Sequence, residues 1–247
     1  MAKGETYEEF IEKFKPKKTT DDCYTPEPIY DALIGWLRGK TGRPLTDEVI
    51  RPFYPGGDYK NAKYPPGCCV VDNPPFSILA EIVRFYKDRD IPFLLFCDGK
   101  SAFNKLTNGI QLVLTDASIT YENGASVYSS FITNMLTREE HILVDPKLNI
   151  CLREANKRKE PKKITLNKYP DDFACFATLS AFARRDCHIA ISEEEIESRH
   201  NHLYDEQGKK VSVFGGGFKL RHPFPPPIDN KEKVLEVRRP LNYCKKD

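Results

Sequence analysis

Residues 68–97 read CCVVDNPPFSILAEIVRFYKDRDIPFLLFC, and this stretch decides the predicted fold. Its apolar runs at 68–72 and 91–97 have the length and the near-continuous apolar character of strands that are covered on both faces. Between them, residues 77–89 place their apolar side chains at helical spacing. A strand, a helix and a second strand in this order predict a parallel sheet, and hence an α/β protein.

Further elements extend this pattern in both directions. Upstream, Thr25 and Pro26 are typical of a helix start, and the helix is expected to end near Gly39. The other expected elements are a short strand at 49–53, a short helix at 101–106, a strand at 111–114, an antiparallel hairpin of 118–121 with 126–135 that turns at 122–124, and a helix from Asp145 to about 157. We expect the hairpin at one edge of the sheet.

A basic, proline-interrupted segment at 157–163 (KRKEPKK) predicts the main boundary of the chain. We therefore expect an N-terminal helix and linker at 1–20, a core at 21–157, and a smaller C-terminal α/β extension with an extended tail at 158–247. Within this extension the pattern predicts a helix at 173–184, a strand at 187–191, an acidic helix from Ser192, and a strand with a glycine bend at 211–218.

The composition is that of an ordinary globular protein, with 40% apolar residues and a formal net charge of +2 over 247 residues. A local basic surface, at 157–163 with Arg184, Arg185, Arg238 and Arg239, would either follow a phosphate backbone or be a solvated loop.

The eight cysteines form no Cys-x-x-Cys pair and the histidines have no metal spacing beyond His200-x-His202. We expect neither disulfides nor a metal site. A signal core and a long apolar run are absent, which predicts a cytoplasmic protein with no membrane contact.

Asn73-Pro74-Pro75-Phe76 directly follows the first of these strands and predicts a pocket for a planar amino group. The exocyclic nitrogen of adenine is a poor nucleophile, because its lone pair is delocalised into the ring. Acceptors on both amino hydrogens would hold that pair out of conjugation: the Asn73 amide oxygen and the Pro74 carbonyl, whose direction the next proline ring fixes. Phe76 would stack on a base that has left the duplex.

Other uses of this stretch remain open. The same geometry would serve a cytosine amino group or a glutamine side-chain amide. A strand-to-loop turn that uses proline to end the strand is the structural alternative. Asp98 follows the second strand at the same edge of the sheet, either as a contact to cofactor or base or as part of a turn.

These residues resemble the signature of the DNA amino-methyltransferases, Asp/Asn/Ser-Pro-Pro-Tyr/Phe/Trp. Together with residues 23–30 (CYTPEPIY) and 51–59 (RPFYPGGDY), in that order, they are similar to the EcoRI-type adenine-specific methyltransferase family of restriction-modification systems and phages. The resemblance implies a Rossmann-like class I methyltransferase sheet, S-adenosyl-L-methionine as methyl donor, and the N6 amino group of adenine in DNA as acceptor. It assigns catalysis to Asn73, Pro74, Pro75 and Phe76.

By position, the resemblance assigns cofactor contacts to Tyr24, Thr25, Pro26, Pro52, Phe53, Gly56, Gly57, Asp58 and Asp72. The chain departs from the family at Arg51, where an acid is usual, and at Pro55, where the first glycine belongs. Asn73 also follows Gly57 by only sixteen positions. That span is too short for the two strands that normally carry the ribose-binding acid and the adenine wall, so we expect a sheet reduced in strand number, with Asp58 or Asp72 as the acid.

The alternative function is a catalytically inactive methyltransferase-fold protein that acts as a DNA-binding or interaction module.

Overall fold

The computed structural model describes residues 25–41, 49–53, 57–121, 126–156, 165–223 and 236–240. Several expected features lie outside these residues: the helix within 1–20, the hairpin turn at 122–124, the basic segment at 157–163 and the proline-rich tail beyond 223.

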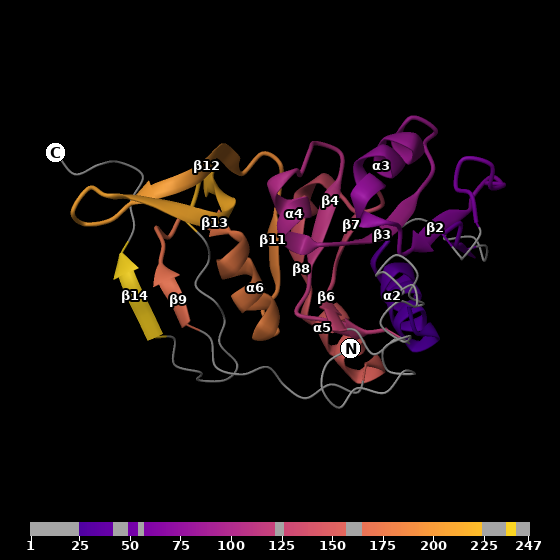
Figure 1. Ribbon diagram of the computed structural model, residues 1–247, viewed down its shortest axis with the longest axis horizontal. Coiled ribbons are helices and arrows are strands. Elements are labelled where there is room, and N and C mark those ends of the chain that lie inside the picture. Colours follow the sequence, from indigo (N-terminus) through magenta and orange to yellow (C-terminus); the bar gives the residue numbers. More distant parts are fainter. Residues whose placement is uncertain are drawn as a thin grey trace, which may run out of the picture.

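A seven-stranded mixed sheet forms the centre of the protein (Figure 1). In spatial order its strands are β1 (Val49–Ile50), β2 (Cys69–Asp72), β3 (Phe93–Cys97), β7 (Ser130–Thr133), β4 (Gln111–Leu114), β8 (Ile142–Val144) and β11 (Ile189–Ile191). The pairs β1–β2, β2–β3 and β4–β8 are parallel, while β7 is antiparallel to both β3 and β4, and β11 is antiparallel to β8. The strands β1, β2, β3, β4 and β8 therefore deliver their carboxyl ends to one edge of the sheet. The α/β prediction is confirmed.

Helices cover both faces of this sheet. The helices α2 (Glu27–Lys40) and α5 (Pro146–Ala155) lie on one face, and α3 (Leu79–Lys87), α4 (Gly99–Asn104) and α6 (Phe176–Arg184) lie on the other. Side chains alternate between the two cores: Val71 and Leu94 pack toward α2 and α5, whereas Val70 and Leu95 pack toward α3 and α6. Because both sides of each strand are buried, these strands read as unbroken apolar runs.

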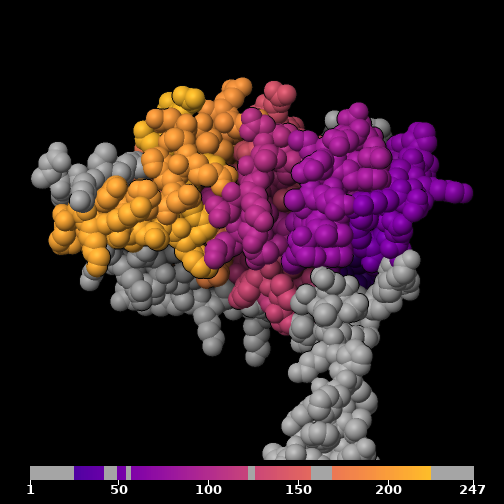
Figure 2. Space-filling model, turned by 45° about the horizontal axis from the view of Figure 1, so that its top comes forward, coloured from indigo at the N-terminus to yellow at the C-terminus, as the bar shows by residue number. Residues whose placement is uncertain are grey.

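Two smaller sheets lie at the C-terminal end of the molecule, to the left in Figure 1. One is antiparallel, with the order β10 (Phe173–Cys175), β13 (Lys210–Leu220) and β12 (Ile196–Tyr204), and the other pairs β9 (Thr165–Lys168) in parallel with β14 (Glu236–Pro240). Gly215 and Gly216 bend β13 with φ angles of +83° and +71°, as predicted for the glycine run. Figure 2 shows this region (orange) packed directly against the middle of the chain (magenta).

The chain beyond residue 157 shares the central core. Strand β11 belongs to the main sheet, and α6 packs on its face through Leu179 and Phe182. From the antiparallel sheet, Phe218 and Leu220 join the same core. The core that α3 and α6 cover is thus built from residues on both sides of the expected boundary.

The acidic helix predicted from Ser192 is wrong, because this segment forms a turn and then strand β12. Along β12, Glu197, Arg199 and Asn201 are exposed while Ser198 and His200 are half-buried, which is the period of a strand. Pairing with β13 outweighs the helix propensity of the glutamates.

The helix predicted at 173–184 is wrong in its first turn, since residues 173–175 form strand β10 and only then does α6 begin. The predicted hairpin is present, formed by β5 (Ser118–Thr120) and β6 (Ser126–Tyr128). Its expected place at the sheet edge is wrong, because its second arm continues as β7 between β3 and β4. The aromatic and β-branched residues of β7 are all buried there, which an edge strand would not achieve.

Local details also differ from the expectations. Helix α2 begins at Glu27 after Pro26, not at a Thr25 cap, and β1 is only two residues long. A 3-10 turn, η2 (Phe76–Ile78), precedes α3, and a second one, η3 (Arg138–Glu140), precedes β8. Between β1 and β2, the described residues 51–53 and 57–68 contain turns but neither strand nor helix. Within the described part of the chain, no helix is long and apolar enough to cross a membrane.

Candidate active site at the end of β2

The carboxylate of Asp72, the last residue of β2, connects three segments of the chain. Its Oδ1 accepts hydrogen bonds from the Tyr30 hydroxyl at 3.0 Å and from the Asn73 N–H at 2.8 Å. Its Oδ2 accepts one from the Phe53 N–H at 2.7 Å. Helix α2, the turn after β1 and the end of β2 therefore meet at one buried acid. Burial raises the pKa of Asp72, and the two N–H donors oppose that rise.

Tyr30 and Arg51 form the outer part of this cluster. The Arg51 guanidinium stacks on the Tyr30 ring, with its carbon 3.6 Å from the ring centroid, and pairs with Glu27 at 2.7 Å. Burial, and then the Asp72 carboxylate, raise the pKa of the Tyr30 phenol well above its ordinary value. Tyr30 thus remains a hydrogen-bond donor to Asp72 at every physiological pH.

The side chain of Asn73 is held next to Tyr121. Asn73 Nδ2 donates to the Tyr121 hydroxyl over a long distance of 3.5 Å. Asn73 Oδ1 is buried and has no hydrogen-bond partner among the described residues. Thr25 Oγ1, Gln111 Oε1 and His141 Nδ1 are likewise buried without a hydrogen-bond partner among the described residues. Asn73 Oδ1 is the amide oxygen of this set that follows the carboxyl end of a parallel strand, where a ligand donor would fit.

The residues that follow Asn73 shape the exit from β2. Pro74 is buried, and Pro75 caps the η2 turn, where its carbonyl accepts from the Ile78 N–H at 3.3 Å. Phe76 is half-buried and packs against the core that α2 and α5 cover. The Asn-Pro-Pro-Phe stretch is thus a rigid strand-to-helix connection that lies at the carboxyl edge of the sheet.

The structure brings together some of the predicted cofactor residues. Thr25 is buried beside the Tyr30 phenol, Pro26 starts α2, and Pro52 is buried in the turn that Phe53 and Asp72 hold. Gly57 and Asp58 are exposed, and the Asp58 carboxylate holds its own turn. Tyr24 and Gly56 are outside the described residues. Asp58 accepts from the Lys60 N–H and the Asn61 amide, and these bonds lower its pKa.

Three further aspartates follow parallel strands at the same edge, and each has a structural partner. Asp98 accepts from the Ser101 N–H and so caps α4, which begins earlier than predicted. Asp116 pairs with Arg184 of α6 at 3.0 Å. The third, Asp145, caps α5 and accepts from the Trp36 indole N–H at 2.9 Å. Asn73 differs from these acids in having an unpaired buried oxygen.

Sequence reasoning missed Tyr30 and Tyr121 as site residues. Tyr30 occupies an apolar position of the α2 stripe, so its spacing indicated only a core residue. Tyr121 follows β5 and is 48 positions from Asn73 in the chain. Proximity at that separation arises from the tertiary fold alone, and neither residue carries a local signal for it.

Comparison of the chain with protein-family models, with curated proteins and with solved structures finds no match in any of the three. Among the described residues, no group of three or more His, Cys, Asp or Glu side chains is placed to hold a metal ion. The function is therefore argued from the geometry of the Asn73 site.

Proposed function

We propose that the protein transfers a methyl group from S-adenosyl-L-methionine to the N6 amino group of a flipped adenine in DNA. The single observation that carries this proposal is the buried, unpaired Oδ1 of Asn73 at the carboxyl end of a parallel strand. An acceptor there would take one amino hydrogen of the base, and the Pro74 carbonyl would take the other. Phe76 would stack on the ring.

The sheet supports this proposal. A parallel sheet with one antiparallel strand inserted between parallel neighbours, here β7 between β3 and β4, is typical of Rossmann-like methyltransferases. The Asn-Pro-Pro-Phe stretch follows β2, which adjoins β1 and the turn that carries Pro52 and Phe53. The acceptor stretch and the expected cofactor turn are therefore neighbours, joined by the bond from Phe53 to Asp72.

In this proposal Asn73 and Tyr121 prepare the site for the base. The Tyr121 hydroxyl holds the nitrogen side of the Asn73 amide, so that the oxygen side faces the incoming amino group. Because Asn73 Oδ1 is enclosed, neighbouring side chains must shift before a base can reach it, while the Tyr121 hydroxyl stays on the nitrogen side of the amide.

The donor side fits S-adenosyl-L-methionine only in part. When bound, the cofactor would supply an electrophilic methyl group on a sulfonium. The residues present would hold its methionine end, with Thr25 at the start of α2 and the turn at Pro52 beside it. The described residues near β1 offer no spare acid for the ribose, since Asp72 already accepts three hydrogen bonds and Asp58 holds its own turn.

This partial fit favours a second candidate, a methyltransferase-fold protein that binds DNA or another partner without catalysis. An exposed aromatic and basic surface suits either function. Phe214 on β13 is 65% exposed, and the Lys100 ammonium of α4 lies 3.3 Å from the centroid of its ring. The Arg199 guanidinium of β12 donates to the carbonyl of Asn104, the last residue of α4. Aromatic and cationic side chains of this kind bind nucleic acid through stacking and phosphate contacts.

Calorimetry with S-adenosyl-L-methionine separates the two candidates. We expect saturable binding by the full chain; no heat at millimolar cofactor would exclude the enzyme and leave the binding module. The acceptor role is tested by tritium transfer from labelled cofactor to adenine-containing duplex DNA. Asn73→Ala is expected to fold normally and to abolish transfer, whereas Asn61→Ala, in the exposed turn at Asp58, is expected to retain it. Undiminished transfer by Asn73→Ala would refute the assigned role.

A further inference from the structure

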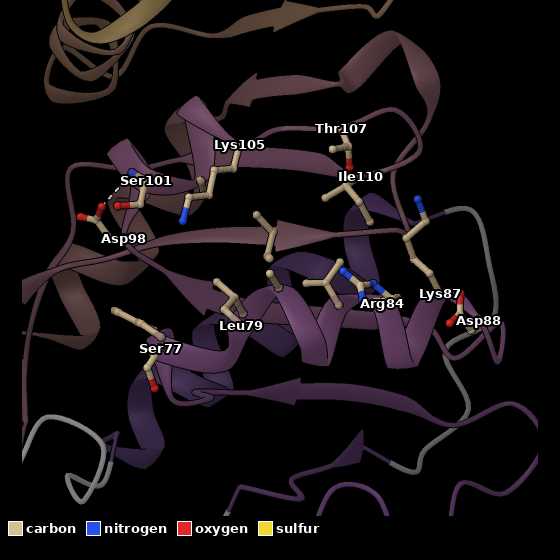
Figure 3. A pocket seen from close by; sticks show the side chains of 15 residues that line it. Ser77, Leu79, Arg84, Lys87, Asp88, Asp98, Ser101, Lys105, Thr107 and Ile110 are labelled. Atoms are coloured by element: carbon tan, nitrogen blue, oxygen red, sulfur yellow. Dashed lines mark hydrogen bonds between the residues drawn. The ribbon is translucent and has the colours of Figure 1, made fainter.

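A groove of about 510 Å³ runs between α3 and α4 on the face of the sheet opposite α2 (Figure 3). Residues of α3, of α4 and the loop that follows it, and of β7 line it. The space-filling view shows the surface hollowed between the purple residues of α3 and the magenta residues of α4 (Figure 2). This volume lies within the range of small-molecule sites.

The groove has an apolar lining. The apolar part of the lining comes from Leu79 and Val83 of α3, Ala102 of α4, Ile132 of β7, and Ile110, which precedes β4. Four of these five side chains, those of Leu79, Val83, Ile110 and Ile132, are branched aliphatic groups, so a ligand placed here would bury apolar surface. Each square ångström of apolar area removed from water contributes about 25 cal/mol.

Cationic side chains line the groove beside these apolar residues. Arg84 of α3 and Lys105, the residue that follows α4, both line the groove, at positions that are separated along its length (Figure 3). Neither forms an ion pair within the described part of the chain. Lys87, nearer the far end, donates to the Asn108 carbonyl at 3.2 Å. The two lining acids lie at opposite ends, with Asp98 turned to its bond with the Ser101 N–H.

We propose that this groove is a binding site for an amphipathic anion, a compact apolar body that carries one phosphate or carboxylate. The apolar body lies on the aliphatic lining, and the anionic group pairs with the Arg84 guanidinium, while the Lys105 ammonium adds positive charge farther along the groove. A guanidinium forms bidentate, charge-assisted hydrogen bonds with a phosphate or a carboxylate. The acids at the two ends confine the anion to the middle of the groove.

The site is separate from the pocket at Asn73. The Asn73 amide is directed toward Tyr121, which packs in the core that α2 and α5 cover, whereas the groove lies on the opposite face under α3 and α4. Phe76 is the residue that both share, at the edge between them. The proposal does not rest on methyl transfer, and its test requires neither cofactor nor DNA.

The test is calorimetric titration of the full chain with 2-naphthyl phosphate, 2-naphthoate and uncharged 2-naphthol. We expect a Kd of about 10–100 µM for the better of the two anions, and binding at least about tenfold weaker for naphthol. The two anions distinguish a phosphate from a carboxylate ligand. Adenosine monophosphate, with a polar body, is expected to bind more weakly than naphthyl phosphate. Tighter binding of naphthol or of adenosine monophosphate would overturn the proposal.

Variants locate the binding. The double variant Arg84→Gln/Lys105→Gln is expected to weaken binding of the anion by about tenfold or more. The matched control Arg138→Gln/Lys63→Gln removes the same charges from exposed positions outside the groove, and is expected to bind within about twofold of the natural chain. Ala102→Trp fills the groove and is expected to abolish binding, with circular dichroism as the check on folding. Equal weakening in both double variants, or no binding by the natural chain, would overturn the proposal.

Discussion

Replacement of Asp72 by asparagine is expected to lower the free energy of unfolding by about 2.5–4 kcal/mol. Asparagine retains one acceptor oxygen, which would keep the bonds from Tyr30 and Asn73. Its NH₂ group then faces the Phe53 N–H, where Oδ2 now accepts at 2.7 Å. The loss of a bond to a charged acceptor costs about 1.5–3 kcal/mol, and the unpaired Phe53 N–H adds about 1 kcal/mol.

The size of this effect should depend on pH. Because burial raises the folded-state pKa of Asp72 above its ordinary value of 3.8, the folded chain binds this proton more tightly than the unfolded chain does. As the pH rises from about 3.8 through the folded-state pKa, Asp72 ionises in the unfolded state before it does in the folded state. Over this range the natural chain loses stability relative to Asp72→Asn. The difference between the two proteins is therefore expected to be greatest near pH 4 and to shrink toward pH 7.

The assay is urea unfolding followed by circular dichroism at several pH values. Tyr30→Phe is the graded control, because it removes one donor to Asp72 and is expected to cost about 1–2 kcal/mol with the pH trend intact. An Asp72→Asn protein as stable as the natural chain would refute the role of Asp72 as the link between β2 and the turn after β1. A destabilisation that grows with pH would refute the direction of the pKa shift.

Two further predictions concern other positions. Tyr121→Phe removes the hydroxyl that contacts Asn73. It is expected to lower methyl transfer about three- to tenfold while the thermal midpoint of unfolding stays unchanged. A loss of stability that accounts for the whole loss of transfer would assign Tyr121 a purely structural role. Gly217→Ala places a Cβ against the Phe173 ring and is expected to lower the free energy of unfolding by about 1–3 kcal/mol. Gly35→Ala, with no atom within 4 Å of its Cβ, is expected to raise it by about 0.5–1 kcal/mol, and urea unfolding measures both. Equal effects at the two glycines would contradict the packing of β10 on β13.

The central strands could be predicted from sequence because their environment is uniform. Strands β2, β3 and β4 are covered on both faces, so every residue is buried and the local apolar run is itself the signal. Strand β12 was not predictable in this way. Its glutamates favour a helix locally, and only its partner β13, which follows it in the chain, makes it a strand. The position of β7 likewise depends on β3 and β4, and its own four residues do not specify a place in the sheet.

The candidate site was predictable to the same extent. The residue types of the Asn73 stretch and its place after a buried strand follow from local pattern, and the structure places them there. The links that hold the site, from Asp72 to Tyr30 and from Asn73 to Tyr121, span 42 and 48 positions. Contacts of that separation depend on how α2 and the β5–β6 hairpin pack, which no short motif records.

The position of β7 has a consequence for the order in which the sheet can form during synthesis. Strands β1, β2 and β3 make one parallel ladder, and β4 and β8 make another, and within the sheet only β7 joins them. Residues 130–133 leave the ribosome after both β3 and β4, so until then β3 lacks a partner on one side, and β4, which is also made before β8, lacks one on both. A nascent chain that stalls in the hairpin before β7 would expose β3 and β4, the two strands that flank the middle of the finished sheet, and the cell must protect that intermediate from pairing with other chains.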